Sequence, residues 1–523
     1  MAFGAVEALW RIGWGAVGLL LLLWAWRGLE RLWWRPRMLE RALRAQGLRG
    51  TRYRFLYGDL KESARLSNEA RAKLMPLSHD IVPRVAPFLY RVMKENGKTS
   101  FTWFGHHPRV AIMDPRLTRE ILSNKFGHFE KSNSHLLVKL LVGGLASYER
   151  EKWAKHRRII NPAFHLEKLK CMLPAFSTCC DELIDKWDRL VASKGSCELD
   201  VWPEFQSFAA DVISRTAFGI NFREGQRIFH LQEEQVELVI PALQNIYIPG
   251  FRFLPTKNNK RMKENDIQIR SLLRSMIERR EVAIRKGGAN NEDLLGLLME
   301  SNFRHSKENE GGSKNSGMSI EDVIEECKLF YFAGHETTSV LLTWTLVALS
   351  LHPSWQARAR EEVLQVFGGN KPDYDGLSRL KIVTMVLYEV LRLYPPAALL
   401  VRKTYKEMKL GQFTFPEGVQ LLLPIIFIHH DPEFWGEDAS EFNPERFAEG
   451  VSKASKIQGA FFPFGGGPRI CIGQNFSMME AKMALSRILQ HFTFQLSPSY
   501  AHAPYTVATI HPQHGAQIIL HRQ

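Results

Sequence analysis

The stretch PFGGGPRICIGQNFSMMEAKMALSRILQ, from Pro463 to Gln490, decides the fold of this chain. Its consecutive glycines and Pro468 predict a tight turn whose backbone can closely approach a flat ligand. Cys471 follows the turn and precedes Gly473 and a stretch with apolar residues at helical spacing. A thiol at a helix N-terminus lies close to free N–H groups, which favour the thiolate. The segment therefore predicts a cysteine that can be a nucleophile, a redox centre or an axial ligand to iron.

The complete pattern around this cysteine is Phe464-x-x-Gly467-x-Arg469-x-Cys471-x-Gly473. A single cysteine is ordinarily a buried structural thiol. This combination instead resembles the heme-binding signature of the cytochrome P450 superfamily, the heme-thiolate monooxygenases. The resemblance implies heme b (iron protoporphyrin IX) as the cofactor and Cys471 as the axial ligand of its iron. It also implies that Phe464, Arg469 and Gly473 take part in binding the cofactor.

The resemblance covers essentially the whole chain after an N-terminal apolar segment, and residues 35–62 and 435–450 resemble the plant microsomal seventy-two clan. It implies a mainly α fold with small β-sheets in a single large domain. The residue patterns agree with this fold class. They predict a β-hairpin between Lys98 and Pro115, helices from there to about Leu393, and strands with proline punctuation in 398–405 and 418–430. A polar, Gly/Ser-rich loop is expected at residues 301–318.

Two further motifs support the resemblance. In YEVLRLYPP, Glu389 and Arg392 are spaced i, i+3 and can pair on a helix face. Such a pair is usually a solvated surface ion pair, but the resemblance adds Arg446 of NPERF and implies a structural triad. By the same resemblance, Trp153 and Arg157 of EKWAKHRR bind a heme propionate. Arg402 and Arg469 are also expected at the propionates, since the guanidinium fork binds carboxylates bidentately.

The motif AGHETTS, residues 333–339, introduces polar side chains into an apolar helix. A zinc site of the His-Glu-x-x-His type is excluded, because Ser339 stands where the second histidine would be. The motif resembles the oxygen-activation sequence of the same superfamily. The resemblance implies that Thr337 holds water beside the iron and that Glu336 belongs to a proton relay. We expect these roles rather than a back-bonded helix threonine for Thr337, whereas His335 is expected to be a core histidine.

The segment Ile12 to Trp26 is strongly hydrophobic, and snorkelling of Arg11 extends it back to Ala8, close to the ~20 residues that a bilayer needs. A cleaved signal peptide is disfavoured because no small-x-small site follows. Nine arginines and two glutamates between Arg27 and Arg54 supply half of the net charge of +14. This cluster favours a membrane surface over nucleic acid and a cytosolic location for this side. We expect a lumenal N-terminus at 1–7, a transmembrane anchor at 8–26, a basic linker at 27–60 and a cytosolic domain at 61–523, in the endoplasmic reticulum membrane.

Six cysteines without a Cys-x-x-Cys pair indicate a reducing compartment. Electrons must come from another protein, because the sequence has no Rossmann or flavin fingerprint. The resemblance implies an NADPH-dependent cytochrome reductase on the same membrane, with O2 as co-substrate. Lys152, Lys155 and Arg158 could form its docking face or simply a solvated helix face.

The candidate substrate contacts are Ala333, Ala397, Ala398 and Leu399, which predict an apolar substrate. For the clan this implies a terpenoid, that is, a gibberellin-type diterpenoid, a triterpenoid or a steroid. A fatty acid or a xenobiotic such as a herbicide is the alternative. Two other functions remain open, a heme-thiolate isomerase or dehydratase and a non-enzymatic heme sensor.

Overall fold

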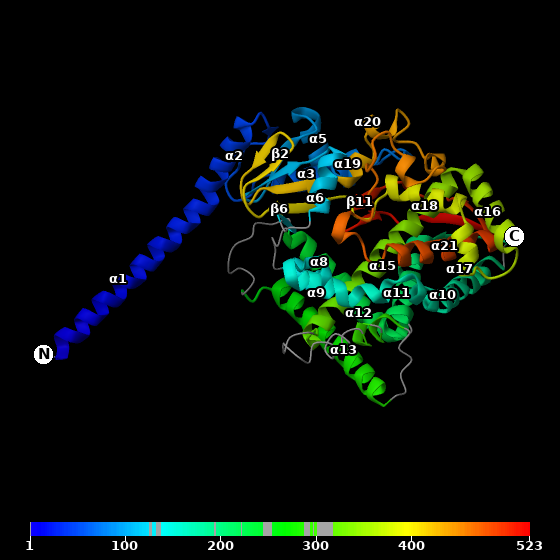
Figure 1. Ribbon diagram of the computed structural model, residues 1–523, viewed down its shortest axis with the longest axis horizontal. Helices are drawn as coiled ribbons and strands as arrows, with labels where there is room; N and C mark the ends of the chain where they lie inside the picture. The colour runs from blue at the N-terminus through cyan, green and yellow to red at the C-terminus, as the bar shows by residue number, and fades with distance from the viewer. Residues whose placement is uncertain are drawn as a thin grey trace.

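The computed structural model describes residues 2–124, 128–131, 137–192, 195–220, 222–243, 254–286, 293–296, 298–300 and 317–523. A mostly helical body carries its six-stranded sheet at the end from which one long N-terminal helix extends, and smaller sheets elsewhere (Figure 1). The mainly α class with small β-sheets is thus confirmed. Most of the polar loop expected at 301–318 lies outside the described residues.

The α-helices of the first half are α1 (Ala2–Leu29), α2 (Arg35–Ala45), α3 (Leu60–Ala72), α4 (Val82–Val85), α5 (Pro87–Asn96), α6 (Pro115–Ser123), α7 (Val138–Leu141), α8 (Gly144–Ser147), α9 (Arg150–Ile160), α10 (Leu166–Ala192), α11 (Val201–Phe218), α12 (Phe222–Leu243) and α13 (Lys257–Arg285). Those of the second half are α15 (Ile320–Leu351), α16 (Pro353–Phe367), α17 (Tyr374–Arg379), α18 (Ile382–Leu393), α19 (Ile425–His429), α20 (Pro432–Trp435) and α21 (Gln474–His491). A π-helical turn, η1 (Glu30–Trp34), joins α1 to α2, and 3-10 turns occur at η2 (Asn161–Phe164), η4 (Pro444–Phe447), η5 (Val451–Lys453) and η6 (Gly467–Arg469).

The largest sheet has the strand order β1-β2-β3-β9-β6-β4, from β1 (Arg49–Gly50), β2 (Ser100–Phe104), β3 (His107–Ala111), β9 (Gln420–Leu423), β6 (Leu400–Thr404) and β4 (Phe129–Lys131). The antiparallel pair β2–β3 confirms the predicted hairpin. Smaller sheets pair β10 (Phe492–Leu496) with β13 (Gln517–Arg522) and β5 (Ser196–Asp200), β11 (Pro504–Thr506) with β12 (Ile510–Pro512), and β7 (Met408–Leu410) with β8 (Phe413–Phe415).

The strand expected across residues 418–430 is only partly correct. Strand β9 ends at Leu423, and Pro424 then starts the short helix α19. Proline fixes its own φ in the helical range and lacks an N–H for the ladder, so it ends a strand and starts a helix at little cost.

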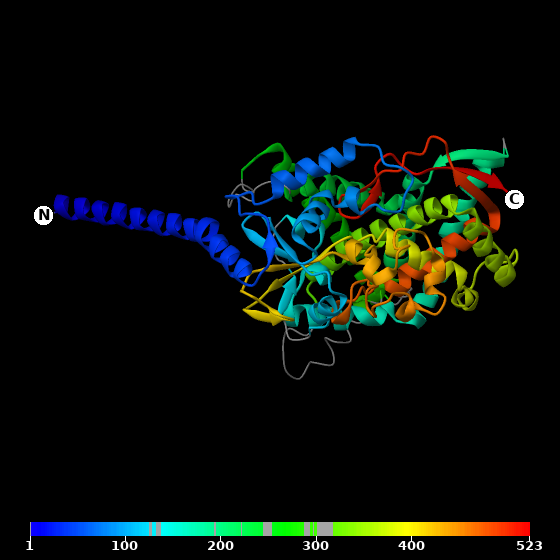
Figure 2. The same cartoon turned by 90° about the horizontal axis from the view of Figure 1, so that it is seen from above.

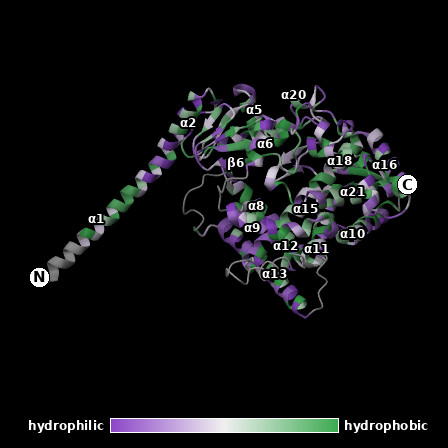
Figure 3. Cartoon of the chain, in the orientation of Figure 1, coloured by the Kyte–Doolittle hydropathy of each residue, from purple (hydrophilic) through white to green (hydrophobic). Residues whose placement is uncertain are grey.

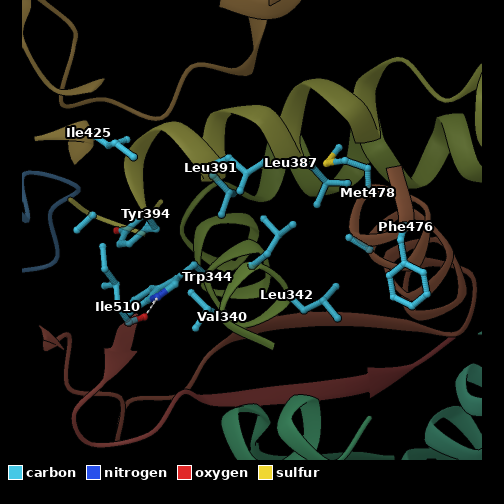
Figure 4. Packing of buried hydrophobic residues seen from close by; sticks show 14 of the residues in the cluster. Val340, Leu342, Trp344, Leu387, Leu391, Tyr394, Ile425, Phe476, Met478 and Ile510 are labelled. Atoms are coloured by element: carbon cyan, nitrogen blue, oxygen red, sulfur yellow. Dashed lines mark hydrogen bonds between the residues drawn. The ribbon is translucent and has the colours of Figure 1, made fainter. Parts of the chain in front are cut away.

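Helix α15 runs through the middle of the body (Figure 1), in contact with α11, α18 and α21. Figure 2 shows the same body from above, with the N-terminal helix extending from one end. Ser319 caps its N-terminus: its hydroxyl accepts from the Asp322 N–H at 3.1 Å, and the Asp322 carboxylate returns a bond to Ser319 N–H. In its C-terminal half Trp344 stacks on Tyr394 of the neighbouring loop, with ring centroids 4.5 Å apart, and donates to Ile510 O at 2.8 Å (Figure 4). Aromatic burial of this kind, with its N–H satisfied, holds α15 rigidly against the C-terminal strands.

Helix α1 is exposed along its described side chains, and apolar residues dominate it until hydrophilic ones take over towards α2 (Figure 3). The helical stretch Ile12–Ala45 is long and apolar enough to cross a membrane. The basic segment after it is partly built into the body, because Pro36, Leu39 and Leu43 of α2 are buried.

Candidate active site

A cavity of about 340 Å³ lies between α15 and the loop that leads into α21. Cys471 lies on its wall on the side of α21, and Ala333, Gly334, Thr337 and Thr338 form the wall on the side of α15. The rest of the wall is mostly apolar and comes from several distant segments, including Leu145, Ile213, Leu294, Leu329, Phe330, Leu341, Ala397, Leu400 and Ile425. The cavity therefore combines one thiol with a large apolar surface.

The loop that presents Cys471 needs its glycines. Gly465 and Gly467 have φ values of 74° and 64°, which side chains disfavour. A Cβ on Gly467 would also lie 2.1 Å from the carbonyl oxygen of Leu122, at the end of α6. The turn is closed by the Cys471 N–H, which donates to Phe464 O at 2.9 Å. The predicted glycine turn and the helix start just after Cys471 are both confirmed.

The Cys471 thiol lies deep in the protein, yet its surface is exposed because it opens onto the cavity. Burial raises the pKa of the Cys471 thiol, and a hydrogen bond from Gly473 N–H and the charge of Arg157 only partly offset this. The N-terminus of α21 therefore does not by itself lower the pKa of this thiol, contrary to the expectation from the sequence. A coordinated metal ion is the group that deprotonates such a thiol outright.

Thr337 and its helix show a second difference from expectation. The Thr337 hydroxyl donates to Ala333 O at 2.7 Å, so the back-bonded arrangement that the sequence analysis had set aside is present. Thr337 nevertheless lines the cavity, and its oxygen retains lone pairs. A Cβ on Gly334 would lie 2.7 Å from Ile213 Cδ1, so a larger residue there would require the Ile213 side chain to move.

Glu336 is not among the described residues that line the cavity. Its Oε1 accepts from Thr509 Oγ1 at 2.6 Å and from His511 Nε2. Burial opposes ionisation of this carboxyl, but the bond and charge of His511 prevail and lower the pKa of Glu336 to about 2. His335 packs on the ring of Phe229, with centroids 5.3 Å apart, and burial lowers its pKa.

A cluster of cations lines one end of the cavity, formed by Lys131, Arg157, Arg402 and Arg469. Arg157 donates to Ile470 O at 3.0 Å, and Arg469 to Tyr148 O at 3.0 Å. The guanidinium of Arg469 also lies over the ring of Trp153, 4.5 Å from its centroid. The structure thus brings together the four residues that were expected at the propionates.

Lys131 is a member of this cluster that the sequence analysis missed. It is the register partner of Arg402 in the antiparallel pair β4–β6. Burial, with the charges of Arg402 and Arg469, lowers the pKa of Lys131 to about 7, and burial lowers that of Arg402 to about 10. The Glu149 carboxylate, which was also missed, accepts a hydrogen bond from the Arg469 guanidinium and another from the backbone N–H of Lys131 at 2.8 Å. One carboxylate thus faces four basic groups, an excess that suits an anionic ligand.

The expected triad forms away from the cavity. Arg392 donates to both oxygens of Glu389 at 2.7 Å, and both side chains are fully buried. The Nε atom of Arg446 lies 3.5 Å from Oε1 of Glu389, and the Arg446 side chain is 8% exposed. The remaining Arg392 donors reach three backbone carbonyls, those of His429, Ala439 and Glu441. The pair is therefore a buried structural bridge between α18 and the segment before α21, and not a surface ion pair.

Of the candidate substrate contacts, Ala333 and Ala397 lie on the cavity wall. Ala398 is buried and Leu399 is 38% exposed, and neither is among the residues that line the cavity, so their contact with a substrate stays a prediction. Both residues precede strand β6, which begins at Leu400, itself a residue of the cavity wall. Lys152 of α9 forms an ion pair with Asp322 at 2.7 Å. One of the three cations proposed for a docking face is therefore already paired within the protein.

Comparison with known proteins gives one consistent result. The family model described as Cytochrome P450 matches residues 84–512. The chain is 66% identical to Cytochrome P450 CYP72A616 of Paris polyphylla over 494 residues, which cover 94% of this chain and 95% of that protein. It is 57% identical to Cytochrome P450 72A397 of Kalopanax septemlobus, with 95% of each covered. It is 56% identical to Cytochrome P450 72A15 of Arabidopsis thaliana, with 95% and 96% covered.

Proposed function

Because the chain belongs to the cytochrome P450 family, in its 72A group, and is thus a heme-thiolate monooxygenase, we propose that it oxidises an apolar terpenoid at the endoplasmic reticulum membrane. Members of this family bind heme b and usually receive electrons from NADPH through a reductase. When bound, heme supplies the activation of O2 at a thiolate-ligated iron.

The cavity residues fit this cofactor. Heme is a flat, apolar macrocycle with two carboxylates on one edge. The cavity offers apolar walls, a thiol facing its interior and, at one end, four cations with one neighbouring carboxylate. We therefore assign Cys471 as the axial ligand, with Phe464 and Gly473 shaping the loop around it. Trp153, Arg157, Arg402, Arg469 and Lys131 would hold the two carboxylates by charge-assisted hydrogen bonds.

Thr337 is proposed to position a proton donor in the cavity. Its own hydroxyl proton is engaged by Ala333 O, so the oxygen is left to accept a hydrogen bond from water or another donor in the cavity. Accepting such a bond would hold the donor in place and so favour proton delivery over loss of reducing equivalents.

Glu336 is proposed to connect this site with the outside. Its carboxylate is anchored to Thr509 and His511, and it adjoins Thr337 in the sequence. Its side chain would have to rotate about its own torsions to reach the cavity side of α15. Protons would then pass from the His511 side to the donor held by Thr337.

The substrate class rests on the aliphatic residues of the cavity wall. Leu145, Ile213, Leu329, Leu341 and Ala397 offer no charge to a bound molecule. Such a wall suits a rigid hydrocarbon skeleton of the diterpenoid, triterpenoid or steroid type, which binds by apolar burial. A substrate of this kind dissolves in the bilayer, which the proposed anchor α1 would keep close to a cytosolic body.

Spectroscopic titration tests this proposal. Purified holoprotein is titrated with gibberellin-type diterpenoids, triterpenoids, steroids, fatty acids and herbicides, and the low-to-high spin shift of heme is followed. We expect a saturable shift with at least one terpenoid. Incubation of that compound with reductase, NADPH and O2 should then give a product with one added oxygen atom. Shifts and products confined to fatty acids or herbicides would contradict the terpenoid assignment, and a rearranged product without added oxygen would indicate an isomerase.

A further inference from the structure

A second cavity, which we call the junction cavity, lies where the N-terminal helix meets the body. Its volume is about 240 Å³, and it is lined by Arg31, Arg35, His106, His107 and Lys403, with Leu39 and Gly418 completing the wall. Arg31 lies in η1 and Arg35 in α2. His106 lies in the turn of the β2–β3 hairpin, and His107 is the first residue of β3. Figure 1 shows this junction at the point where α1 leaves the body.

The charges at the junction cavity are poorly balanced. Three permanent cations, those of Arg31, Arg35 and Lys403, converge there. The Glu417 carboxylate lies 3.8 Å from the Arg35 guanidinium, and the Glu417 side chain is 66% exposed. In the part of the chain that the structure describes, Arg31 and Lys403 have no carboxylate partner. Glu130 is the register partner of Lys403 but pairs with Arg150 at 2.8 Å. Arg31 and Arg35 are exposed, so solvent screens their mutual repulsion, and an anion in the cavity would reduce it further.

The two histidines report the same imbalance. Their rings are 4.0 Å apart at the cavity wall. Burial and the nearby charge of His106, Lys403 and Arg35 lower the pKa of His107 to about 3, and burial with Arg31, Arg35 and Lys403 lowers that of His106. Both rings are therefore neutral N–H donors at neutral pH and can hydrogen-bond an anion.

The backbone keeps this cavity open. Gly418 has a φ of 89°, and a Cβ there would lie 3.3 Å from Nη2 of Arg35 and 3.8 Å from Cε of Lys403. Lys403 points to the face of β6 opposite that of Arg402, because successive side chains alternate along a strand. The junction cavity is therefore separate from the heme site, although both use the same strand.

The position of the cavity along the helix indicates its ligand. The apolar stretch of α1 ends at Trp26, and Arg31 follows about 7 Å further along the axis at ~1.5 Å per residue. The headgroup layer extends roughly 5–8 Å beyond the hydrocarbon core on each side of a bilayer. Arginine forks bind phosphate oxygens bidentately, and neutral imidazoles add single donors.

We propose that the junction cavity binds the phosphate of an anionic lipid headgroup and so fixes the orientation of the catalytic body at the membrane. The proposal rests on the membrane anchor of the proposed function. It assigns a lipid site to Arg31, Arg35 and Lys403, with His106 and His107 as hydrogen-bond donors.

Native mass spectrometry of the full-length holoprotein in mixed phosphatidylcholine and phosphatidylserine micelles tests the proposal. We expect the wild type to retain one phosphatidylserine per chain. The double variant Arg31→Gln/Lys403→Gln should bind it about 30-fold more weakly, since each basic group near an anionic surface contributes about a factor of five. The variant Arg41→Gln/Lys409→Gln removes the same charge from exposed positions outside the cavity and should retain the lipid.

Three results would overturn the proposal. They are equal weakening in the two double variants, equal retention of phosphatidylcholine, and displacement of the lipid by equimolar inorganic phosphate, which would make free phosphate the ligand. The variant Arg31→Lys/Arg35→Lys keeps the charge but removes both forks, and it should also weaken retention. Flotation with pure phosphatidylcholine vesicles reports the anchor separately, so a failed anchor would not be mistaken for a failed lipid site.

Discussion

Glu336 of α15 and His511 of β12 are joined by a hydrogen bond between Oε1 and Nε2, across 175 positions of the sequence. The bond ties the oxygen-activation motif to the C-terminal strands. It also sets the charge of a buried carboxyl, because the pKa of Glu336 is lowered to about 2 despite burial.

This relationship predicts a pH dependence of stability. A carboxyl whose pKa is lower in the folded than in the unfolded state stabilises the fold above its unfolded pKa, and this contribution is lost as the pH falls towards the folded value. The loss should therefore occur between about pH 4.5 and pH 2. In Glu336→Gln, the free energy of unfolding measured with urea should change less between pH 5 and pH 3 than in the wild type. Glu445→Gln, which alters an exposed pair, should behave as the wild type does; an identical pH profile for Glu336→Gln would refute the assignment.

Thr337→Ala should uncouple reductant use from product formation. Without the hydroxyl oxygen the acceptor proposed to hold the proton donor is lost, so NADPH oxidation should continue while product per NADPH falls by roughly 100-fold, the lower end of the usual scale for a positioned proton-transfer group. The matched control is Thr343→Ala, because Thr343 makes the same back-bond, to Ser339 O at 2.8 Å, in a fully buried position. Coupling ratios from NADPH, peroxide and product assays check this; equal coupling in both variants would remove Thr337 from the relay.

Arg392→Ala should be severely destabilising. It removes the bidentate partner of the buried Glu389, which keeps only the more distant Arg446 at 3.5 Å, and leaves three carbonyls without their donor, a loss of about 3–5 kcal/mol. Arg65→Ala breaks an exposed pair of the same i, i+3 spacing with Glu62 and should cost less than about 1 kcal/mol. Urea unfolding midpoints and the heme content of the purified proteins measure both effects. A similar loss of unfolding free energy in the two variants would show that burial does not determine how much the triad contributes to stability.

Lys131→Met should weaken heme retention. Removal of one buried charge-assisted hydrogen bond, worth about 1.5–3 kcal/mol, should speed heme loss to an acceptor protein roughly 10-fold to 100-fold. Lys139→Met removes an exposed lysine of α7 and should leave the rate unchanged. If the two variants lose heme at the same rate, Lys131 does not contact the cofactor.

The residues that the sequence identified correctly belong to local patterns. The turn around Gly467 and the helix after Cys471 each depend on neighbours within a few positions, which the sequence displays directly. The pairing of Glu389 with Arg392 also follows from one helical turn.

What the sequence missed depends on contacts between distant segments. Lys131 reaches the cation cluster through its register with Arg402, 271 positions away (402 − 131). Thr509 and His511 reach Glu336 only because β12 packs beside α15. Leu399 does not line the cavity whereas its neighbour Leu400 does, and which of two adjacent apolar residues faces inward is decided by the packing of the chain before β6.

The central claim is that Cys471 is the axial ligand of heme in this cavity, and the reduced carbon-monoxide complex tests it most directly. We expect the wild type to show the absorption band of a thiolate-ligated heme. In Cys471→Ser that band should be absent, whether heme is lost or retained with another ligand, while circular dichroism reports an intact helical fold. Persistence of the thiolate-type band in folded Cys471→Ser would contradict the account.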